Sequence, residues 1–286
     1  MADRFLFLSD PHLASYWNSE WESKVNEYLD FMNDYYNQHS LDFCLSCGDW
    51  LIQNDSTESA LYKLNVVDSG MRKRFRTVYN VVGNHDYNYQ LWNIEKQTNS
   101  VNPEMLSPKH LREAWCNNFE NTYYTFDTSN AKYVVFDTGL DWTFVTTLND
   151  HLNAQIPWFA NILKSNMTEH ICLVMHILFA DNELKTLGTV AKKIFSMAQA
   201  FNERTTVTID DIKYDFSECT GKIVCAYGGH KHVDYVGMAN GIPVILVIDT
   251  QSGDTPSFDI VYADYENKIV NTERIGTGKN RTITLV

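Results

Sequence analysis

The segment VVGNHDY (residues 81–87) places three polar side chains directly after two valines and a glycine. Valine favours strands, so Asn84, His85 and Asp86 stand where a buried strand ends. A polar turn with no functional role would have this composition. A strand that delivers an amide, an imidazole and a carboxylate to a reaction centre would have it as well. What the other strands carry at their ends distinguishes the two alternatives.

Apolar strands alternate with amphipathic helices along the chain. The segments predicted as strands with polar ends are 4–10, 41–49, 77–86, 170–176 and 222–232. Helices are predicted over 19–38, 56–71, a short stretch after Ser107, 152–165 and 182–202. Ser19 and Glu22 form a candidate capping box for the first helix. This alternation predicts an α/β fold with a largely parallel sheet covered on both faces.

Three further segments have the pattern that is typical of β hairpins. They are residues 122–139, 234–250 and 258–276. Ser129-Asn130 is the expected turn of the first hairpin, and Asn240-Gly241 is a strong turn signal in the second. Because the sequence contains no repeat or flexible linker, we predict a single domain over residues 1–286.

The charge and hydropathy of the chain exclude several functions. The formal net charge of −13 argues against a broad nucleic-acid surface, so long nucleic acid is an improbable partner. The one basic cluster, MRKRFR (71–76), is expected to be a solvated helix end. The chain begins without a basic segment followed by a long apolar one, and no apolar run is long enough to cross a bilayer. We therefore expect a cytoplasmic protein without a membrane partner.

The cysteines do not indicate a zinc site. The CLSC segment (44–47) has no second CxxC at a suitable distance. Cys44, Cys172 and Cys225 each lie in apolar runs, so we expect small buried hydrophobic residues in a reducing compartment.

Each of the five strands with polar ends supplies side chains that can bind a metal. In order along the chain they are Asp10, His12, Asp49, Asn84, His85, His176, His230 and His232. The carboxyl ends of parallel strands meet at one edge of a sheet, where ligands bind. We therefore expect these side chains to converge, although they are distant in sequence.

The number and type of these side chains indicate two metal ions. Leaving His85 aside, two carboxylates, one amide oxygen and four imidazoles exceed the four ligands of a single zinc site. They fit two divalent ions if one carboxylate bridges them, an arrangement that clamps a phosphate and activates water. Mixed oxygen and nitrogen ligands suit Mn, Fe or Zn better than Ca or Mg, and Mn is our first choice.

The motifs D-x-H (10–12), GD (48–49), GNHD (83–86), a lone histidine and GH-x-H (229–232) occur in this order. In this the chain resembles the calcineurin-like metallophosphoesterase superfamily over most of its length. The resemblance implies a four-layer α/β/β/α sandwich, with two mixed sheets flanked by helices.

The resemblance also implies a role for each residue of the motifs. The ligands that it implies for the first ion are Asp10, His12, Asp49 and His232. Those for the second ion are Asp49, Asn84, His176 and His230, so that Asp49 bridges. His85 becomes the catalytic imidazole beside the phosphate, oriented by Asp86. The segment MHILF departs from the usual motif, so His176 is assigned from its position at a strand end, with His151 and His170 as competitors.

The function implied is a dinuclear metal-dependent phosphoesterase, in which a metal-activated hydroxide attacks phosphorus. We expect small phosphate mono- or diesters as substrates, including nucleotides and glycerol-phosphate compounds. The alternatives are a nuclease acting on single-stranded or nucleotide substrates, and a metal-binding scaffold without turnover. Five aromatic residues follow motif positions and could wall a substrate pocket or pack in the core: Trp50, Tyr87, Tyr89, Trp92 and Trp142.

The end of the chain carries a glycine-rich segment. ERIGTG (273–278) is faintly similar to the tail of some bacterial and phage members, which is compatible with such an origin. GTGKN (276–280) lacks the leading glycine and the Ser/Thr of a phosphate-binding loop, so we assign it no such role.

Overall fold

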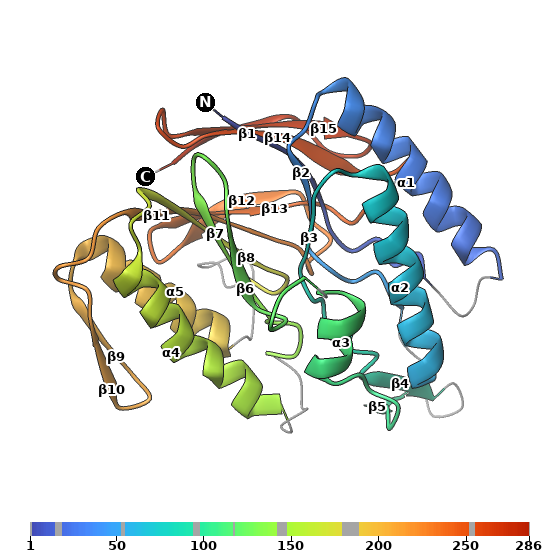
Figure 1. Ribbon diagram of the computed structural model, residues 1–286, viewed down its shortest axis with the longest axis horizontal. Coiled ribbons are helices and arrows are strands. Elements are labelled where there is room, and N and C mark those ends of the chain that lie inside the picture. Colours follow the sequence, from blue (N-terminus) through green and yellow to red (C-terminus); the bar gives the residue numbers. More distant parts are fainter. Residues whose placement is uncertain are drawn as a thin grey trace.

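Two six-stranded mixed sheets lie face to face between helices (Figure 1). This computed structural model describes residues 2–14, 19–52, 55–93, 98–116, 118–141, 148–178, 189–251 and 255–285, with the backbone alone at 92, 93, 98 and 99. The resulting order of layers is helices, sheet, sheet, helices, which confirms the predicted four-layer sandwich.

The first sheet has the strand order β16-β15-β14-β1-β2-β3. Its strands are β1 (Asp3–Leu8), β2 (Phe43–Ser46), β3 (Val78–Asn80), β14 (Phe258–Asp264), β15 (Ile269–Ile275) and β16 (Arg281–Thr284). The first three are parallel, and β14 to β16 are added as antiparallel neighbours of β1. The carboxyl ends of β1, β2 and β3 therefore lie at one edge.

The second sheet has the order β12-β13-β11-β8-β7-β6. Its strands are β6 (Tyr124–Asp127), β7 (Lys132–Phe136), β8 (His170–Met175), β11 (Lys222–Gly228), β12 (Tyr235–Ala239) and β13 (Ile242–Leu246). The central four are parallel. The predicted hairpin turns are confirmed, since Ser129-Asn130 lies between β6 and β7 and Asn240-Gly241 between β12 and β13.

Two short hairpins were not predicted. They are β4 (Gln90–Asn93) with β5 (Thr98–Val101), and β9 (Thr206–Ile209) with β10 (Ile212–Asp215). Strands of this length bury few side chains, so they leave a weak apolar pattern in the sequence.

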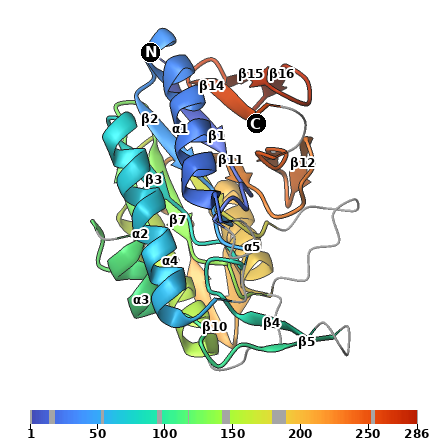
Figure 2. The same cartoon turned by 90° about the vertical axis from the view of Figure 1, so that its right-hand side faces the viewer.

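Long helices cover the outer faces of the sheets, as Figures 1 and 2 show from two directions. Helices α1 (Trp21–Gln38) and α2 (Thr57–Arg74) cover the first sheet, and α4 (Asn149–Ser165) and α5 (Thr189–Glu203) the second. The short α3 (Pro108–Ala114) begins after Ser107, as predicted, with the Ser107 hydroxyl accepting from the His110 amide. Helix α1 buries Val25, Leu29, Met32 and Tyr36, a stripe of period 3.6.

The start of the first helix differs from the prediction, and the predicted start of the last one lies outside the described residues. The Ser19 capping box is wrong, because α1 begins at Trp21 and Glu20 occupies the N-cap position without a side-chain hydrogen bond. Of the helix predicted over 182–202, residues 182–188 lie outside the described part, and α5 begins at Thr189. The basic cluster forms the last turn of α2, as predicted, where Arg72 pairs with Asp68.

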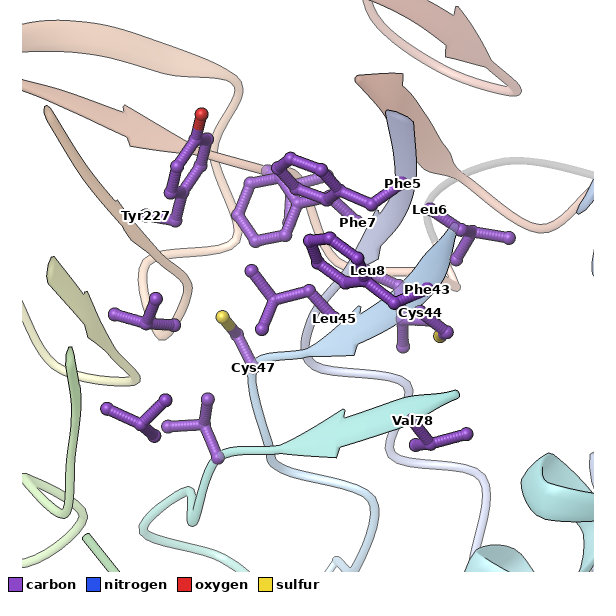
Figure 3. Close-up of a cluster of buried hydrophobic side chains, with 14 of the residues drawn as sticks. Phe5, Leu6, Phe7, Leu8, Phe43, Cys44, Leu45, Cys47, Val78 and Tyr227 are labelled. Atoms are coloured by element: carbon purple, nitrogen blue, oxygen red, sulfur yellow. The ribbon is translucent and has the colours of Figure 1, made fainter. Parts of the chain in front are cut away.

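Aromatic side chains fill the space between the sheets. Phe5 and Phe7 of β1 point toward the second sheet, with ring centroids 5.4 Å and 5.5 Å from that of Tyr227 on β11 (Figure 3). Leu6 points to the opposite face (Figure 3), toward the helices, as strand alternation requires. Cys44 and the other buried cysteines are free thiols, as expected for small core residues.

Asp141 ties the start of α5 to the loop after β7. Its two carboxylate oxygens each lie 2.7 Å from one backbone amide, that of Val190 or Ala191. Asp141→Ala should lower the free energy of unfolding by about 1–2 kcal/mol, because these amides lose their acceptor. Urea denaturation measures this loss. The matched control is Asp150→Ala in the first turn of α4, where an exposed carboxylate gives about 0.5 kcal/mol or less; equal losses would contradict the capping role.

Candidate metal centre

The polar side chains that follow the parallel strands converge at one edge of the sandwich. Asp10 and His12 follow β1, Asp49 follows β2, and Asn84 follows β3. From the second sheet come His176 after β8, and His230 and His232 after β11. The predicted convergence is therefore confirmed, and the centre lies where the two sheets meet.

One group of side chains contains Asp10, His12 and His232, whose candidate ligand atoms lie within 4.8 Å of one another. The Nε2 atom of His232 is 3.2 Å from Asp10 Oδ1 and 3.3 Å from His12 Nε2. His12 Nε2 is also 3.9 Å from Asp49 Oδ2. Asp49 thus joins this group at its edge.

A second group contains Asp49, His176 and His230, within the same distance of one another. His176 Nε2 lies 3.1 Å from Asp49 Oδ2 and 3.1 Å from Asn84 Oδ1. His230 Nδ1 lies 2.9 Å from the same Asn84 oxygen. Asp49 Oδ2 therefore lies between the two groups, 3.9 Å from His12 Nε2 and 3.1 Å from His176 Nε2.

The hydrogen bonds of two histidines show that this centre fits a cation. His176 Nδ1 donates to the Cys47 carbonyl at 2.5 Å, and His12 Nδ1 to the Leu51 carbonyl at 3.0 Å. With Nδ1 donating to a carbonyl, each ring turns Nε2 toward oxygens that are acceptors, so this nitrogen needs either a proton or a cation between itself and them. Asp10 Oδ1 is buried and makes no hydrogen bond of ordinary geometry, although His232 Nε2 lies 3.2 Å from it. A cation satisfies such converging acceptors, so the residues present fit divalent metal ions.

The pKa shifts in the centre also indicate that it favours a positive charge. Burial alone would lower the pKa of His176, but the carboxylates of Asp49 and Asp10 raise that pKa to about 10. Burial, together with the charge of His176, lowers the pKa of His230 to about 3. Burial disfavours the charge on Asp49, yet the neighbouring His176 lowers the pKa of this carboxyl group below its ordinary value. The donor set thus attracts one positive charge to its middle.

The backbone of the ligand loops is unusual. Five of the positions in question have a left-handed backbone: Asp10, His12, Asp49, His230 and His232, with φ from 45° to 72°. Non-glycine residues rarely adopt this conformation, and it clusters at functional sites. Gly83 allows the loops to approach, because a Cβ there would overlap the Asp49 carboxylate.

The hydrogen bonds of the Asp86 carboxylate go to backbone amides, and its expected role in orienting His85 stays a prediction. Its carboxylate accepts the backbone amides of Asp49, Trp50 and Gly83, each at 2.9 Å, and that of Leu51 at 3.3 Å. Asp86 thus holds the Asp49 loop against the GNHD turn. Burial and the charge of Asp49 raise the pKa of Asp86 to about 6. Sequence reasoning missed this role because the partners are backbone amides of another loop.

His85 lies beside the centre and does not face away from it. Its amide donates to Asp49 Oδ1 at 2.7 Å, its Nδ1 is 3.4 Å from the Ile52 carbonyl, and its ring centroid is 4.6 Å from that of His12. His12, Asp49 and His85 also form a third group with ligand atoms within 4.8 Å. The geometry therefore allows His85 either to contact a substrate or to bind an ion.

The competitors for the lone histidine lie elsewhere. His151 Nε2 is 3.0 Å from the buried Asp137 carboxylate, and His170 begins β8 whereas His176 follows its end. Of the aromatic residues that could wall a pocket, Trp50, Tyr87 and Tyr89 are buried, which confirms core packing for these three. The side chain of Trp92 and the whole of Trp142 lie outside the described residues.

An α/β/β/α sandwich with carboxylates and histidines at the ends of its parallel strands defines a class of metal-dependent hydrolases. The chain belongs to the calcineurin-like phosphoesterase family, whose sequence model matches residues 3–234. It is accordingly a metal-dependent phosphoric ester hydrolase that uses divalent ions. No curated protein matches the chain in sequence.

Solved structures share the fold at low sequence identity. A dimetal phosphatase from Danio rerio is 12% identical, with a TM-score of 0.65 and 99% of each chain covered. The purple acid phosphatase PPD1 from yellow lupin seeds is 11% identical, with a TM-score of 0.57, 99% of this chain covered and 54% of the lupin chain. GAP50, described as the anchor in the inner membrane complex of Plasmodium, is 13% identical, with a TM-score of 0.53 and coverage of 99% and 88%. At these identities the similarity shows the fold alone.

None of the helices in the described ranges combines the length and apolar character of a membrane span.

The contacts of Asp86 predict a loss of metal affinity on substitution. In Asp86→Asn one acceptor oxygen becomes an amide that faces backbone donors, which loosens the loop carrying Asp49. We expect a stability loss of about 2–3 kcal/mol and a metal affinity reduced roughly 10–100-fold. Denaturation and calorimetric titration with Mn²⁺ measure the two effects. Wild-type metal affinity with impaired turnover would instead support a role for Asp86 acting through His85.

Proposed function

We propose that this protein is a dinuclear phosphoesterase that hydrolyses small phosphate mono- or diesters. The observation that carries the proposal is the position of Asp49, whose carboxylate contacts both groups of candidate ligands. The two groups together supply enough ligands for two sites. A carboxylate that lies between them is the arrangement expected for two ions and is not needed for one.

The ligands divide into two sets around Asp49. Asp10, His12 and His232 would hold one ion with Asp49, and Asn84, His176 and His230 would hold the other with it. Imidazole nitrogen and carboxylate oxygen together favour Mn²⁺, with Fe and Zn as the other candidates. When bound, such a pair supplies a nucleophile from water near neutral pH and neutralises the charge of the phosphate.

The residues of the chain provide the rest of the chemistry. The burial of Asp10, Asp49, Asn84 and His176 fixes the inner side of the centre, whereas the His232 side chain is 44% exposed and marks its open side. His85 would act as the catalytic imidazole: it stabilises the phosphoryl oxygens and gives a proton to the leaving alkoxide. Its Nδ1 contact with the Ile52 carbonyl leaves the other ring nitrogen for this task.

The small size of the substrate is inferred from charge. A net charge of −13 repels a polyanion, whereas a single phosphate group meets only the local field of the centre. A panel of nucleotides, glycerol-phosphate compounds, aryl esters and single-stranded DNA tests this with Mn²⁺ present. Hydrolysis of the small esters supports the proposal. Preference for DNA would favour a nuclease, and absence of any turnover would favour a scaffold.

The shared carboxylate predicts how metal content responds to substitution. Wild-type protein loaded with Mn²⁺ should hold about two ions per chain. Asp49→Asn should weaken both sites, because each loses the same ligand, whereas the matched variant His12→Ala should weaken mainly one. Elemental analysis and Mn²⁺ titration measure this. Two tightly bound ions and normal turnover in Asp49→Asn would exclude the bridge.

The position of His85 predicts that metal content and turnover separate. His85→Asn should keep wild-type metal content, because no ligand is lost, while kcat falls by on the order of 10²–10⁴. If His85 protonates the leaving group, the loss should be larger for alkyl esters than for nitrophenyl esters, which depart without a proton. Loss of an ion from the variant would make His85 a ligand, in line with its group with His12 and Asp49.

A further inference from the structure

The glycine-rich turn at residues 276–280 contacts a loop of the metal centre. It joins β15 to β16, in the part of the chain after residue 234 that the family model does not match. The amide of Lys279 donates to Asp234 Oδ2 at 3.2 Å. Gly278 has φ of +119°, and a Cβ there would lie 2.8 Å from both Asp234 Oδ2 and Arg274 Nη1. Glycine therefore allows the turn to close over Asp234.

Two arginines complete the surroundings of Asp234. Its Oδ1 lies 3.1 Å from Arg274 Nη2 and 2.7 Å from Arg281 Nη1. Both arginines also bind Asp259 of β14, Arg274 through Nε at 2.7 Å and Arg281 through Nη2. The side chains of Asp259 and Arg274 are almost completely buried. We call these four residues the arginine clamp.

The arginine clamp joins the two sheets. Asp259, Arg274 and Arg281 belong to the strands β14, β15 and β16 of the first sheet. Arg281 Nη1 also donates to the carbonyls of Tyr235 and Leu246, which are on β12 and β13 of the second sheet. The clamp therefore fixes the point where the chain enters β12, directly after the GH-x-H motif.

His232 is the ligand nearest to this point. One residue, Val233, separates it from Asp234, and its backbone has φ of +53°. Its ring contacts Asp10 and His12, which are themselves candidate ligands of the same ion. His230 has a further anchor, because its amide donates to Asp10 Oδ2 at 2.9 Å. Asp234 is therefore fixed two residues after His232, at the exposed end of the motif.

We propose that Asp234 is a positioning residue, and that the arginine clamp sets the affinity of the ion held by Asp10, His12 and His232. The inference rests on the proposed dinuclear centre. Residues that orient a ligand without binding the metal typically change its affinity 10–100-fold. The clamp acts mainly on this site. His230, a ligand of the other ion in the same loop, is held separately by the hydrogen bond from its amide to Asp10 Oδ2.

The test compares Asp234→Asn with a matched variant, Asp68→Asn. Asp68 also pairs with an arginine and is buried, but it lies in α2, and its contact on the side of the sheet is with Asn80 at the end of β3 and not with a candidate ligand. Metal-free proteins are titrated with Mn²⁺ by calorimetry, and electron paramagnetic resonance distinguishes single from paired ions. We expect Asp234→Asn to weaken one site roughly 10–100-fold and to give single-ion spectra at two equivalents of Mn²⁺. Excess Mn²⁺ should restore kcat.

The control and a second variant separate positioning from stability. Asp68→Asn should lower the unfolding temperature and keep both ions. Gly278→Ala, which keeps all four charges and displaces Asp234 by contact, should weaken the same site by a smaller factor. The proposed role of the clamp is overturned if Asp234→Asn and Gly278→Ala keep wild-type metal affinity at both sites. It is also overturned if both sites are weakened equally. A single ion in the wild-type protein would instead overturn the dinuclear centre, before any variant is compared.

Discussion

The buried carboxylate of Asp49 is the group on which the geometry of the centre depends. It is 1% exposed, and a buried charge requires compensation by hydrogen bonds or opposite charge. One oxygen accepts the amide of His85, and the other faces His12 and His176. Its own loop is held by Asp86 through backbone amides. In the proposed centre, divalent ions bound by Asp49 would complete that compensation.

The centre also depends on how the two sheets are spaced. Asp10, His12, Asp49 and Asn84 follow strands of the first sheet, whereas the other three candidate ligands follow strands of the second. The rings of Phe5, Phe7 and Tyr227 fill the layer between the sheets and keep them at a fixed separation (Figure 3). A tightly packed core behind the centre therefore determines the distance between ligands from the two sheets.

The sequence predicted the convergence of the ligands because strand ends are marked by short apolar runs that stop at polar residues. It also predicted both layers of helices. It did not predict that Asp86 turns toward another loop, since spacing in sequence carries no information about which distant amides a carboxylate meets. The Ser19 capping box failed because a local pattern cannot decide where tertiary contacts let a helix begin. The two interpretations of the segment 81–87, a polar turn and a strand end that brings polar groups to a site, are compatible. Residues 84–88 form a turn, and that turn also brings Asn84 to the centre.

The candidate ligands are far apart in the sequence, and this separation determines when their contacts can form during folding. Asp10 is close to the N-terminus, and His230 and His232 follow β11 in the last quarter of the sequence. Contacts between such distant segments form late, because closing long loops is entropically costly. A chain that ends before β11 lacks His230 and His232, and therefore lacks one candidate ligand of each set. Ions that bind only the complete sets of ligands would stabilise the folded protein by mass action.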